Sequence, residues 1–198
     1  MILALDTSGT ELLVALVDDG RQVAGRAVPG PRHQDQIIEL VTDLAGDQLA
    51  ALEALAVSRG PGSHTGLRVG LSTASGIAFA RRLPIYPLSS LAVAAQRAPS
   101  QAGRVLAIVA AGRGRVYVQQ FDRTGDGLRA AGAPRLETLE GLAVEGAVVA
   151  GEPTLLAQLE APPGARSGVD ALTAAVVEAV GAGEAVNYDQ LTGDYGDF

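Results

Sequence analysis

The stretch VSRGPGSHTGLRVG, residues 57–70, joins an apolar segment to a helical segment through a glycine-rich turn. Gly60 and Gly62 allow the positive φ angles that a tight corner between a strand and a helix needs. Ser63 or Thr65 then supplies a hydroxyl that can cap the helix. Because a turn before a helix also carries free N–H groups that can bind an anion, the stretch has two interpretations, a structural corner and an anion site.

The helix predicted after the turn, residues 63–82, favours the structural corner. Gly66, Gly70, Ala74 and Ala78 are spaced four apart and form one stripe of small side chains. A glycine inside a helix costs about 1 kcal/mol relative to alanine, so several of them require an offsetting close contact. We therefore expect the turn to aim this helix at a near neighbour.

The anion site remains the weaker alternative. It would combine the turn with the end of the first apolar segment, and Asp6 would hold Mg²⁺ through water. ATP and Mg²⁺ are expected only under this alternative; otherwise no cofactor is. Its candidate residues are Asp6, Thr7, Ser8, Gly62 and Ser63.

Apolar runs bounded by turn residues predict strands, and apolar residues at helical spacing predict helices. In the first half these patterns predict strands at 2–8, 11–20, 21–28, 51–60 and 83–89, with helices at 31–46, 63–82 and 89–98. In the second half they predict strands at 104–112, 114–122, 126–134 and 147–152, with helices at 136–143 and 169–183. The tail from residue 187 has no periodicity and is predicted to be irregular.

A small, polar stretch at residues 99–103 suits a boundary between two units. The sequence therefore predicts an N-terminal lobe, residues 1–98, and an abbreviated C-terminal lobe, residues 99–198, that ends in an acidic tail. The expected fold class is α/β. Each lobe is expected to be ribonuclease-H-like, a mixed sheet that opens with three antiparallel strands and is flanked by helices.

The composition excludes several kinds of chemistry. The 198 residues include no cysteine and no lysine, which excludes disulfides, thiolate nucleophiles, a Schiff base and a P-loop lysine. His33 and His64 are the only histidines, and Ile37 stands four residues after His33, so no metal site is expected. A peptidase based on Ser63 and His64 is implausible because adjacent side chains at a helix start point in different directions. No catalytic residue is predicted.

The net charge is −7, with +3 over residues 1–136 and −10 over residues 137–198. An acidic chain is a poor candidate to hold nucleic acid alone and a better one to meet a basic protein. An acidic surface that only aids solubility is an equal alternative for the last third. The start MILALDTSG lacks signal-peptide features, so we expect a cytoplasmic protein without a membrane span.

Four blocks resemble the TsaB family of tRNA threonylcarbamoyladenosine biosynthesis proteins. They are ILALDTS, HQDQIIELV, SRGPGSHTGLRVGLSTASGIA and VLAIVAAGRGRVYVQQF, and together they span most of residues 1–121. The resemblance implies the two-lobed fold of the sugar-kinase/actin/Hsp70 superfamily. It also implies a non-catalytic scaffold that pairs with a TsaD-like catalytic subunit and a TsaE-like ATPase, which transfer threonylcarbamoyl to adenosine 37 of tRNA. tRNA would bind to the complex and not to this subunit alone.

The resemblance also implies that the first two helices form the pairing surface. We expect Ile38, Val41, Leu67 and Leu71 to be partly exposed in the free subunit, where an isologous homodimer is a natural substitute for the partner. The full set of expected interface residues is His33, Ile37, Ile38, Val41, Leu44, Leu67, Arg68, Gly70, Leu71 and Ala74.

One departure from the family pattern bears on catalysis. Ala110-Ala111-Gly112 replaces the Asp-Ala-Arg that the family commonly carries at the end of the first strand of the second lobe. The rival interpretation, an independent ATP-binding phosphotransferase or carbamoyltransferase of the same superfamily, would need a carboxylate there.

Overall fold

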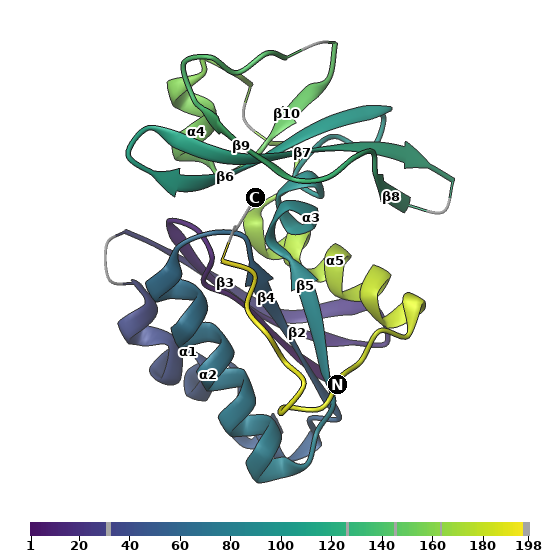
Figure 1. Cartoon of the computed structure of the whole chain (residues 1–198). Helices are drawn as coiled ribbons and strands as arrows, with labels where there is room; N and C mark the ends of the chain where they lie inside the picture. The colour runs from purple at the N-terminus through teal and green to yellow at the C-terminus, as the bar shows by residue number, and fades with distance from the viewer. Residues whose placement is uncertain (31–32, 126, 145, 163, 196–198) are drawn as a thin grey trace.

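Two five-stranded sheets form the frame of the chain, and helices pack on both faces of each (Figure 1). The computed structural model describes residues 1–30, 33–125, 127–144, 146–162 and 164–195, without the side chains of residues 33 and 34. The α/β class with two mixed sheets is confirmed.

The first sheet is built from the N-terminal strands. Its order is β3 (Arg21–Pro29), β2 (Glu11–Asp18), β1 (Ile2–Asp6), β4 (Ala54–Gly60) and β5 (Ile85–Ser89). The first three strands are antiparallel, whereas β4 runs parallel to both β1 and β5. The carboxyl ends of β1 and β4 therefore meet at one edge of the sheet, where the glycine-rich turn begins.

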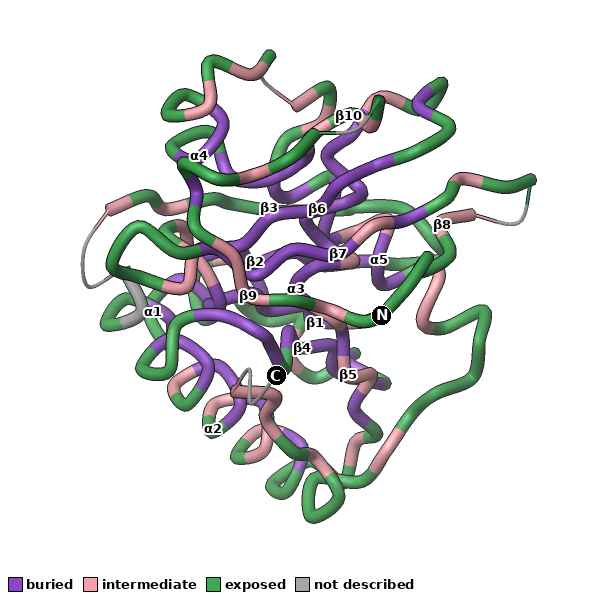
Figure 2. The backbone as a smooth tube through the Cα atoms, turned by 45° about the horizontal axis from the view of Figure 1, so that its top comes forward, coloured by how far each residue is buried: buried purple, intermediate pink, exposed green. Residues whose placement is uncertain are grey.

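Both faces of the first sheet are covered, which explains why β2 is apolar at every interior position. One face packs on α1 (Ile37–Ala45) and α2 (His64–Arg81), and the other packs on α5 (Gly168–Ala182). Leu12, Val14 and Leu16 point to the α1 and α2 side, and the alternate residues Leu13, Ala15 and Val17 point to α5. Figure 2 shows β1, β2 and β4 as the buried centre of the molecule.

The second sheet has the order β10 (Val148–Ala150), β6 (Arg104–Gly112), β7 (Arg115–Thr124) and β8 (Gly127–Ala130), and β9 (Arg135–Thr138) also pairs with β7. β6, β7 and β8 are antiparallel, and β10 is parallel to β6. α3 (Ser90–Ala95) covers one face and α4 (Pro153–Gln158) covers the other. Two 3-10 helices, η1 (His33–Gln36) and η2 (Gly46–Ala51), flank α1.

The predicted helix at 136–143 is wrong. Its first residues form β9, in which Leu136 pairs with Tyr117 of β7, and a turn follows. Leu136 and Leu139 enter the cores on opposite sides of the sheet. The pairing offered by the edge of β7 therefore overrides the local helical spacing of the leucines.

The C-terminal residues do not stay with the second sheet. α5 packs on the first sheet, where Val169, Leu172 and Val176 share a core with β1 and β2. The tail follows the same lobe, because Val186 forms an antiparallel bridge with Ile85 of β5. The expected lobe of residues 99–198 thus contributes its last helix and tail to the other lobe. The apolar face of α5 fits the one sheet face that α1 and α2 leave open.

Gly62, just before α2, and Gly66 and Gly70 within it lie against the loop after β1. A Cβ atom at Gly62 would overlap the carbonyl oxygen of Ser8, and one at Gly66 would overlap that of Thr7. At Gly70 a Cβ would overlap the hydroxyl oxygen of Thr7. The stripe of small residues therefore lets α2 pack directly against the loop after β1, as the structural interpretation of the turn requires.

This packing predicts opposite effects for two glycines in one helix. Gly66→Ala should lower the free energy of unfolding by about 1–3 kcal/mol, because the new methyl group collides with backbone. Gly76→Ala is the matched control: apart from its chain neighbours and the adjacent backbone of its own helix, no described atom lies within 4 Å of its added Cβ. This control should raise stability by about 0.5–1 kcal/mol through helix propensity. Urea unfolding of both variants measures the difference, and equal effects would contradict the packing.

Candidate functional site

The loop after β1 carries three polar residues that are buried and bonded within the chain. Asp6 Oδ1 accepts hydrogen bonds from the backbone N–H of Ser8 at 2.9 Å and from the Ser8 hydroxyl at 2.6 Å. The Thr7 hydroxyl donates to the carbonyl oxygen of Gly66 at 2.7 Å. All three residues are less than a tenth exposed. The loop is thus fixed to the start of α2.

The glycine-rich turn uses its own donors in the same way. The Ser63 N–H donates to the Ser8 carbonyl oxygen at 2.7 Å, and Ser63 Oγ accepts from the Gly66 N–H at 3.2 Å. Gly60 has a φ of 121°, a conformation suited to glycine. Ser63 is therefore a helix cap, and the turn has the geometry of a structural corner. The anion site at Asp6, Thr7, Ser8, Gly62 and Ser63 stays a prediction.

His64 does not form a relay with Ser63. Its ring lies against Tyr195 of the tail, with 5.2 Å between ring centroids. The neighbouring Asp194 donates its N–H to the carbonyl oxygen of Arg59 at 2.6 Å. The tail therefore closes over the turn from outside.

A glutamate that the sequence analysis did not single out joins the two sheets at this loop. Glu152 precedes α4 and is 9% exposed. Its Oε1 accepts from the Thr10 N–H at 2.6 Å and its Oε2 accepts from the Thr10 hydroxyl at 2.8 Å. A Cβ atom at Gly9 would overlap this carboxyl group. The loop between β1 and β2 therefore holds a carboxylate supplied by the other lobe.

Burial raises the pKa of the Glu152 carboxyl above its ordinary value, and the negative charge of Asp6 adds to the rise. The hydrogen bonds from Thr10 and the charge of Arg97 act in the opposite direction without cancelling it. Asp6 and Glu152 are the two buried acids of this junction. Of the described residues, no group of three or more His, Cys, Asp or Glu side chains could hold a metal ion.

A second polar contact nearby joins β2 of the first sheet to the segment after α3, the helix that packs on the second sheet. Arg97, which is 5% exposed, donates from Nη2 to Glu11 Oε2 at 2.6 Å. Its carbonyl oxygen accepts from the Ala165 N–H at 2.9 Å. Because Arg97 and Glu11 are both largely shielded from water, removing either partner would leave a buried charge unpaired, which is strongly destabilising.

The expected pairing surface needs correction. Val41, Leu67 and Leu71 are 4%, 0% and 8% exposed, so the predicted exposure of these three side chains is wrong. They face the first sheet and belong to its core. Ile37, Gly70 and Ala74 are also buried, and Leu44 is half-buried. A substitution such as Leu71→Glu would therefore test folding and not association. The His33 side chain lies outside the described residues.

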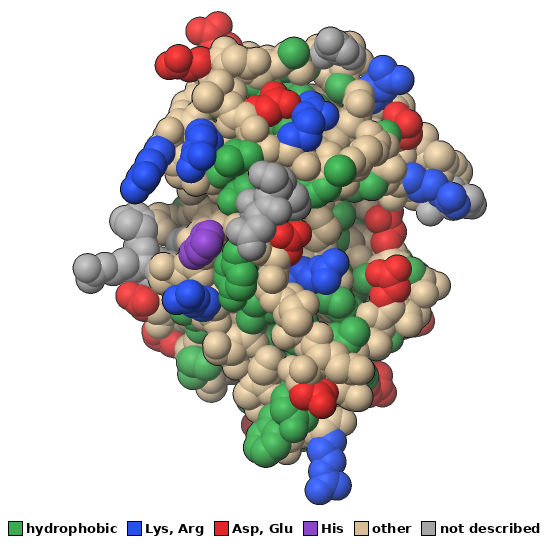
Figure 3. All heavy atoms as spheres, in the orientation of Figure 1, with side chains coloured by type: hydrophobic (Ala, Val, Ile, Leu, Met, Phe, Trp, Pro, Cys, Tyr) green, Lys and Arg blue, Asp and Glu red, His purple; other side chains and the backbone are tan. Residues whose placement is uncertain are grey.

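The exposed face of these helices is a different set of residues. Ile38 is 61% exposed on α1, and Arg68 and Ser72 are exposed on α2. Phe79 is 65% exposed, and its ring packs edge-on against Tyr188 with 5.2 Å between centroids. Figure 3 shows hydrophobic side chains gathered at the lower tip of the molecule, where Figure 1 places the end of α2.

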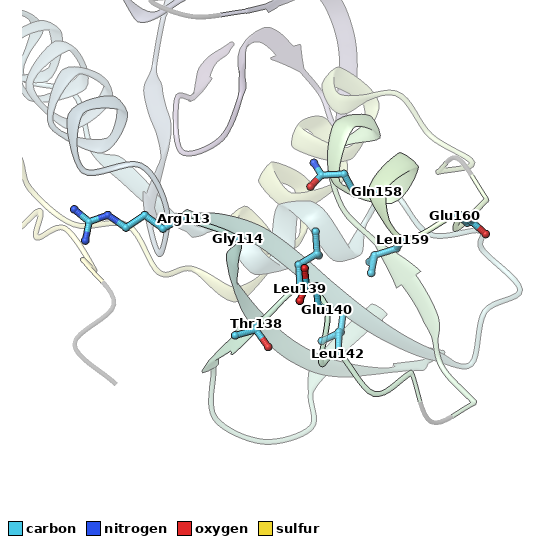
Figure 4. Close-up of a pocket in the computed structure, with 9 residues that line it drawn as sticks. All are labelled: Arg113, Gly114, Thr138, Leu139, Glu140, Leu142, Gln158, Leu159 and Glu160. Atoms are coloured by element: carbon cyan, nitrogen blue, oxygen red, sulfur yellow. The ribbon is translucent and has the colours of Figure 1, made fainter.

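A cavity of about 720 Å³ lies on the second lobe, away from these features (Figure 4). Leu139, Leu142 and Leu159 line it together with Glu140 and Gln158. In Figure 4, Arg113 extends away from the other labelled residues. The described residues that line this open cavity form no cluster of buried, hydrogen-bonded polar side chains like the one at Glu152.

A titration experiment tests the buried glutamate. Because the pKa of Glu152 is raised in the folded state, its contribution to stability is fully present below about pH 4.5 and is lost as the pH rises through the raised value. Glu152→Gln removes this titration and keeps an acceptor for Thr10. The free energy of unfolding of the wild type, measured in urea at several pH values, should therefore fall more with rising pH than that of the variant.

The matched control is Glu184→Gln, which changes an exposed glutamate. Its stability should follow the wild-type pH dependence in parallel. Parallel curves for Glu152→Gln as well would show that Glu152 is not buried as described.

Comparison with known proteins agrees with the resemblance seen in the sequence. The sequence model of the family TsaD, tRNA N6-adenosine threonylcarbamoyltransferase, matches residues 28–160. The chain is 38% identical to the tRNA threonylcarbamoyladenosine biosynthesis protein TsaB of Escherichia coli over 64% of this chain and 57% of that protein. It is also 38% identical to TsaB of Haemophilus influenzae, over 62% and 54%. The matched segment thus spans about half the length of these curated relatives.

The structural comparison covers more of the chain. YeaZ from Pseudomonas aeruginosa superposes with a TM-score of 0.82 at 31% identity, and the match covers 98% of both chains. None of the helices in the described ranges is long and apolar enough to cross a membrane. The chain belongs to the TsaB family of tRNA threonylcarbamoyladenosine biosynthesis proteins.

Proposed function

We propose that this chain acts in the biosynthesis of threonylcarbamoyladenosine on tRNA as a non-catalytic subunit that pairs with a TsaD-like catalytic subunit. The names of its relatives supply the pathway. The observation that carries the pairing role is the outer face of α1 and α2. This face presents Ile38 and Gly76 to solvent, while the inner glycines of α2 are used inside the lobe.

Gly76 supports this proposal because packing within the chain does not account for it. It lies in the interior of α2, where glycine costs about 1 kcal/mol relative to alanine. Apart from its chain neighbours and the adjacent backbone of its own helix, no described atom lies within 4 Å of a Cβ built on it, and it is exposed. A partner backbone or helix that approaches closely would offset this cost. Ser72 and Ala80, also exposed on α2, leave the same approach open.

The charges of the face suggest what the partner presents. Asp35, Glu39 and Asp43 are exposed on and just before α1, and Arg68 is exposed on α2. A TsaD-like partner should therefore place basic groups opposite α1 and an acidic group opposite Arg68. The apolar centre of the contact would be Ile38. In the absence of the partner, two copies would pair through the same face.

Two features support an accessory role over catalysis. Two N–H groups of the candidate anion site are already bonded within the chain, that of Ser8 to Asp6 and that of Ser63 to the Ser8 carbonyl oxygen. At the corresponding end of β6, Ala110, Ala111 and Gly112 bring no carboxylate. We therefore assign ATP and Mg²⁺ to the partner subunits, including a TsaE-like ATPase, and tRNA to the complex. The setting of such a complex would be the cytoplasm.

Two substitutions on the outer face test the pairing. Ile38→Glu and Gly76→Leu should each weaken binding to a TsaD-like subunit by at least about tenfold, because they place a charge or bulk in the contact. Both variants should remain folded, since neither side chain enters the core. Calorimetric titration with the purified partner measures the loss.

Val23→Glu is the matched control. Val23 is 55% exposed on β3, and the neighbouring Gly25 lies against Val169 of α5, on the face of the sheet away from α1 and α2. This variant should bind the partner as the wild type does. Unchanged binding of Ile38→Glu and Gly76→Leu would refute the pairing surface, and ATP turnover by the isolated chain would favour the rival phosphotransferase.

A further inference from the structure

A second cavity, of about 570 Å³, opens where α3 and α5 meet the second sheet, and two arginines line it. Arg123 comes from β7, and Arg166 comes from the segment just before α5. Gln96, Asp170 and Glu178 also line the cavity. The site is separate from the outer face of α1 and α2 and from the junction at Glu152.

Arg123 has unused hydrogen-bonding capacity. Its Nε and Nη2 atoms are shielded from solvent and have no hydrogen-bond partner in the described structure. Leaving buried donors of a charged group unpaired is energetically costly, more so than for a neutral group. Burial lowers the pKa of Arg123, and the positive charge of Arg166 lowers it further. The two guanidinium groups thus repel one another across the cavity.

The nearby carboxylates neutralise this pair only in part: the charge of Glu178 raises the pKa of Arg123 without cancelling the effects of burial and of Arg166. Among the described residues, no carboxylate lies within ion-pair distance of Arg123 or Arg166. Glu178 accepts the N–H of Leu128 at 3.3 Å, and Asp170 accepts the Ser167 hydroxyl at 2.7 Å. Arg166 donates from Nη1 to Gln96 Oε1 at 3.2 Å. This hydrogen bond to a neutral amide fixes the position of the Arg166 side chain without neutralising its charge.

We propose that this cavity binds a phosphate group between Arg123 and Arg166. An oxyanion placed there would offset the repulsion between the two guanidinium groups, and a rotation of the Arg123 side chain toward the cavity would let it accept the N–H groups that are now shielded and unpaired. Arginine suits this task because its planar fork donates two parallel hydrogen bonds to phosphate oxygens. The N-terminus of α5, which Ser167 caps beside the cavity, adds a favourable dipole. The phosphate could belong to a free phosphate compound or to an RNA backbone.

The test begins with inorganic phosphate and the full chain. With a dissociation constant of about 1 mM, phosphate at ~10 mM should raise Tm by about 3 °C over chloride of equal ionic strength. Arg123→Gln and Arg166→Gln should each lose most of this rise. Arg115→Gln, which removes an exposed arginine from the same strand β7, should keep it.

A competition arm identifies the source of the phosphate. If a short RNA hairpin displaces phosphate from the wild type and from Arg115→Gln alike, but binds Arg123→Gln at least about tenfold more weakly, the site takes a phosphodiester. If only inorganic phosphate binds, the site takes a free phosphate compound. An equal rise of Tm in the wild type and in both cavity variants, or no rise beyond chloride, would overturn the proposal. The test does not involve the partner subunit. A negative result would therefore overturn the phosphate site and leave the proposed pairing surface unaffected.

Discussion

The contact between α2 and the loop after β1 is the constraint on which the rest of the structure depends. Gly62, Gly66 and Gly70 bring the helix within reach of Thr7 and Ser8, closer than any side chain would allow. The backbone groups of the turn and the loop bond one another across this contact. The rotation of α2 about its axis is therefore fixed. Its leucines must enter the core, and Arg68, Ser72, Gly76 and Phe79 must face outward.

The same contact links the glycine-rich turn to the junction between the lobes. The loop that receives α2 on one side continues to Thr10, which binds Glu152 of the other lobe. Burying the Glu152 carboxylate removes favourable hydration, although an N–H and a hydroxyl of Thr10 bond to it. The pKa of Glu152 is raised mainly because of this lost hydration. The pair of Arg97 and Glu11 adds a second, oppositely charged tie. Together, these contacts favour one arrangement of the two sheets, a property suited to a subunit that presents a fixed surface.

The sequence predicted the helices and strands better than it predicted which part of the chain packs against each of them. The apolar runs identified the described strands except β9, because a sheet covered on both faces leaves continuous apolar segments such as β2. The spacing of glycines in α2 correctly indicated a close neighbour. Helical spacing misled at Leu136 and Leu139, where strand pairing with β7 decided the structure. Periodicity also locates an apolar face without telling whether a sheet or a partner covers it, so Val41 and Leu71 were assigned to the wrong surface.

Contacts between residues far apart in the sequence could not be predicted from local sequence patterns. Glu152 meets Thr10 across 142 positions. The sequence analysis placed Glu152 at the end of the predicted strand 147–152 and predicted no helix after it, so neither its partner nor its place before α4 was foreseen. Arg123 and Arg166 approach one another only because α5 returns to the first lobe, which no segment-by-segment pattern indicates. The helix at 169–183 was predicted, but the sheet that it covers was not.

The account claims that the inner face of α2 is committed to its own lobe and that the outer face of α1 and α2 is free for a partner. Hydrogen–deuterium exchange of the chain alone and bound to a TsaD-like subunit tests this claim most directly. The account predicts that binding slows exchange along residues 37–45 and 72–81, with no added protection at β10 or α4. Protection confined to the second sheet, with α1 and α2 unchanged, would contradict it.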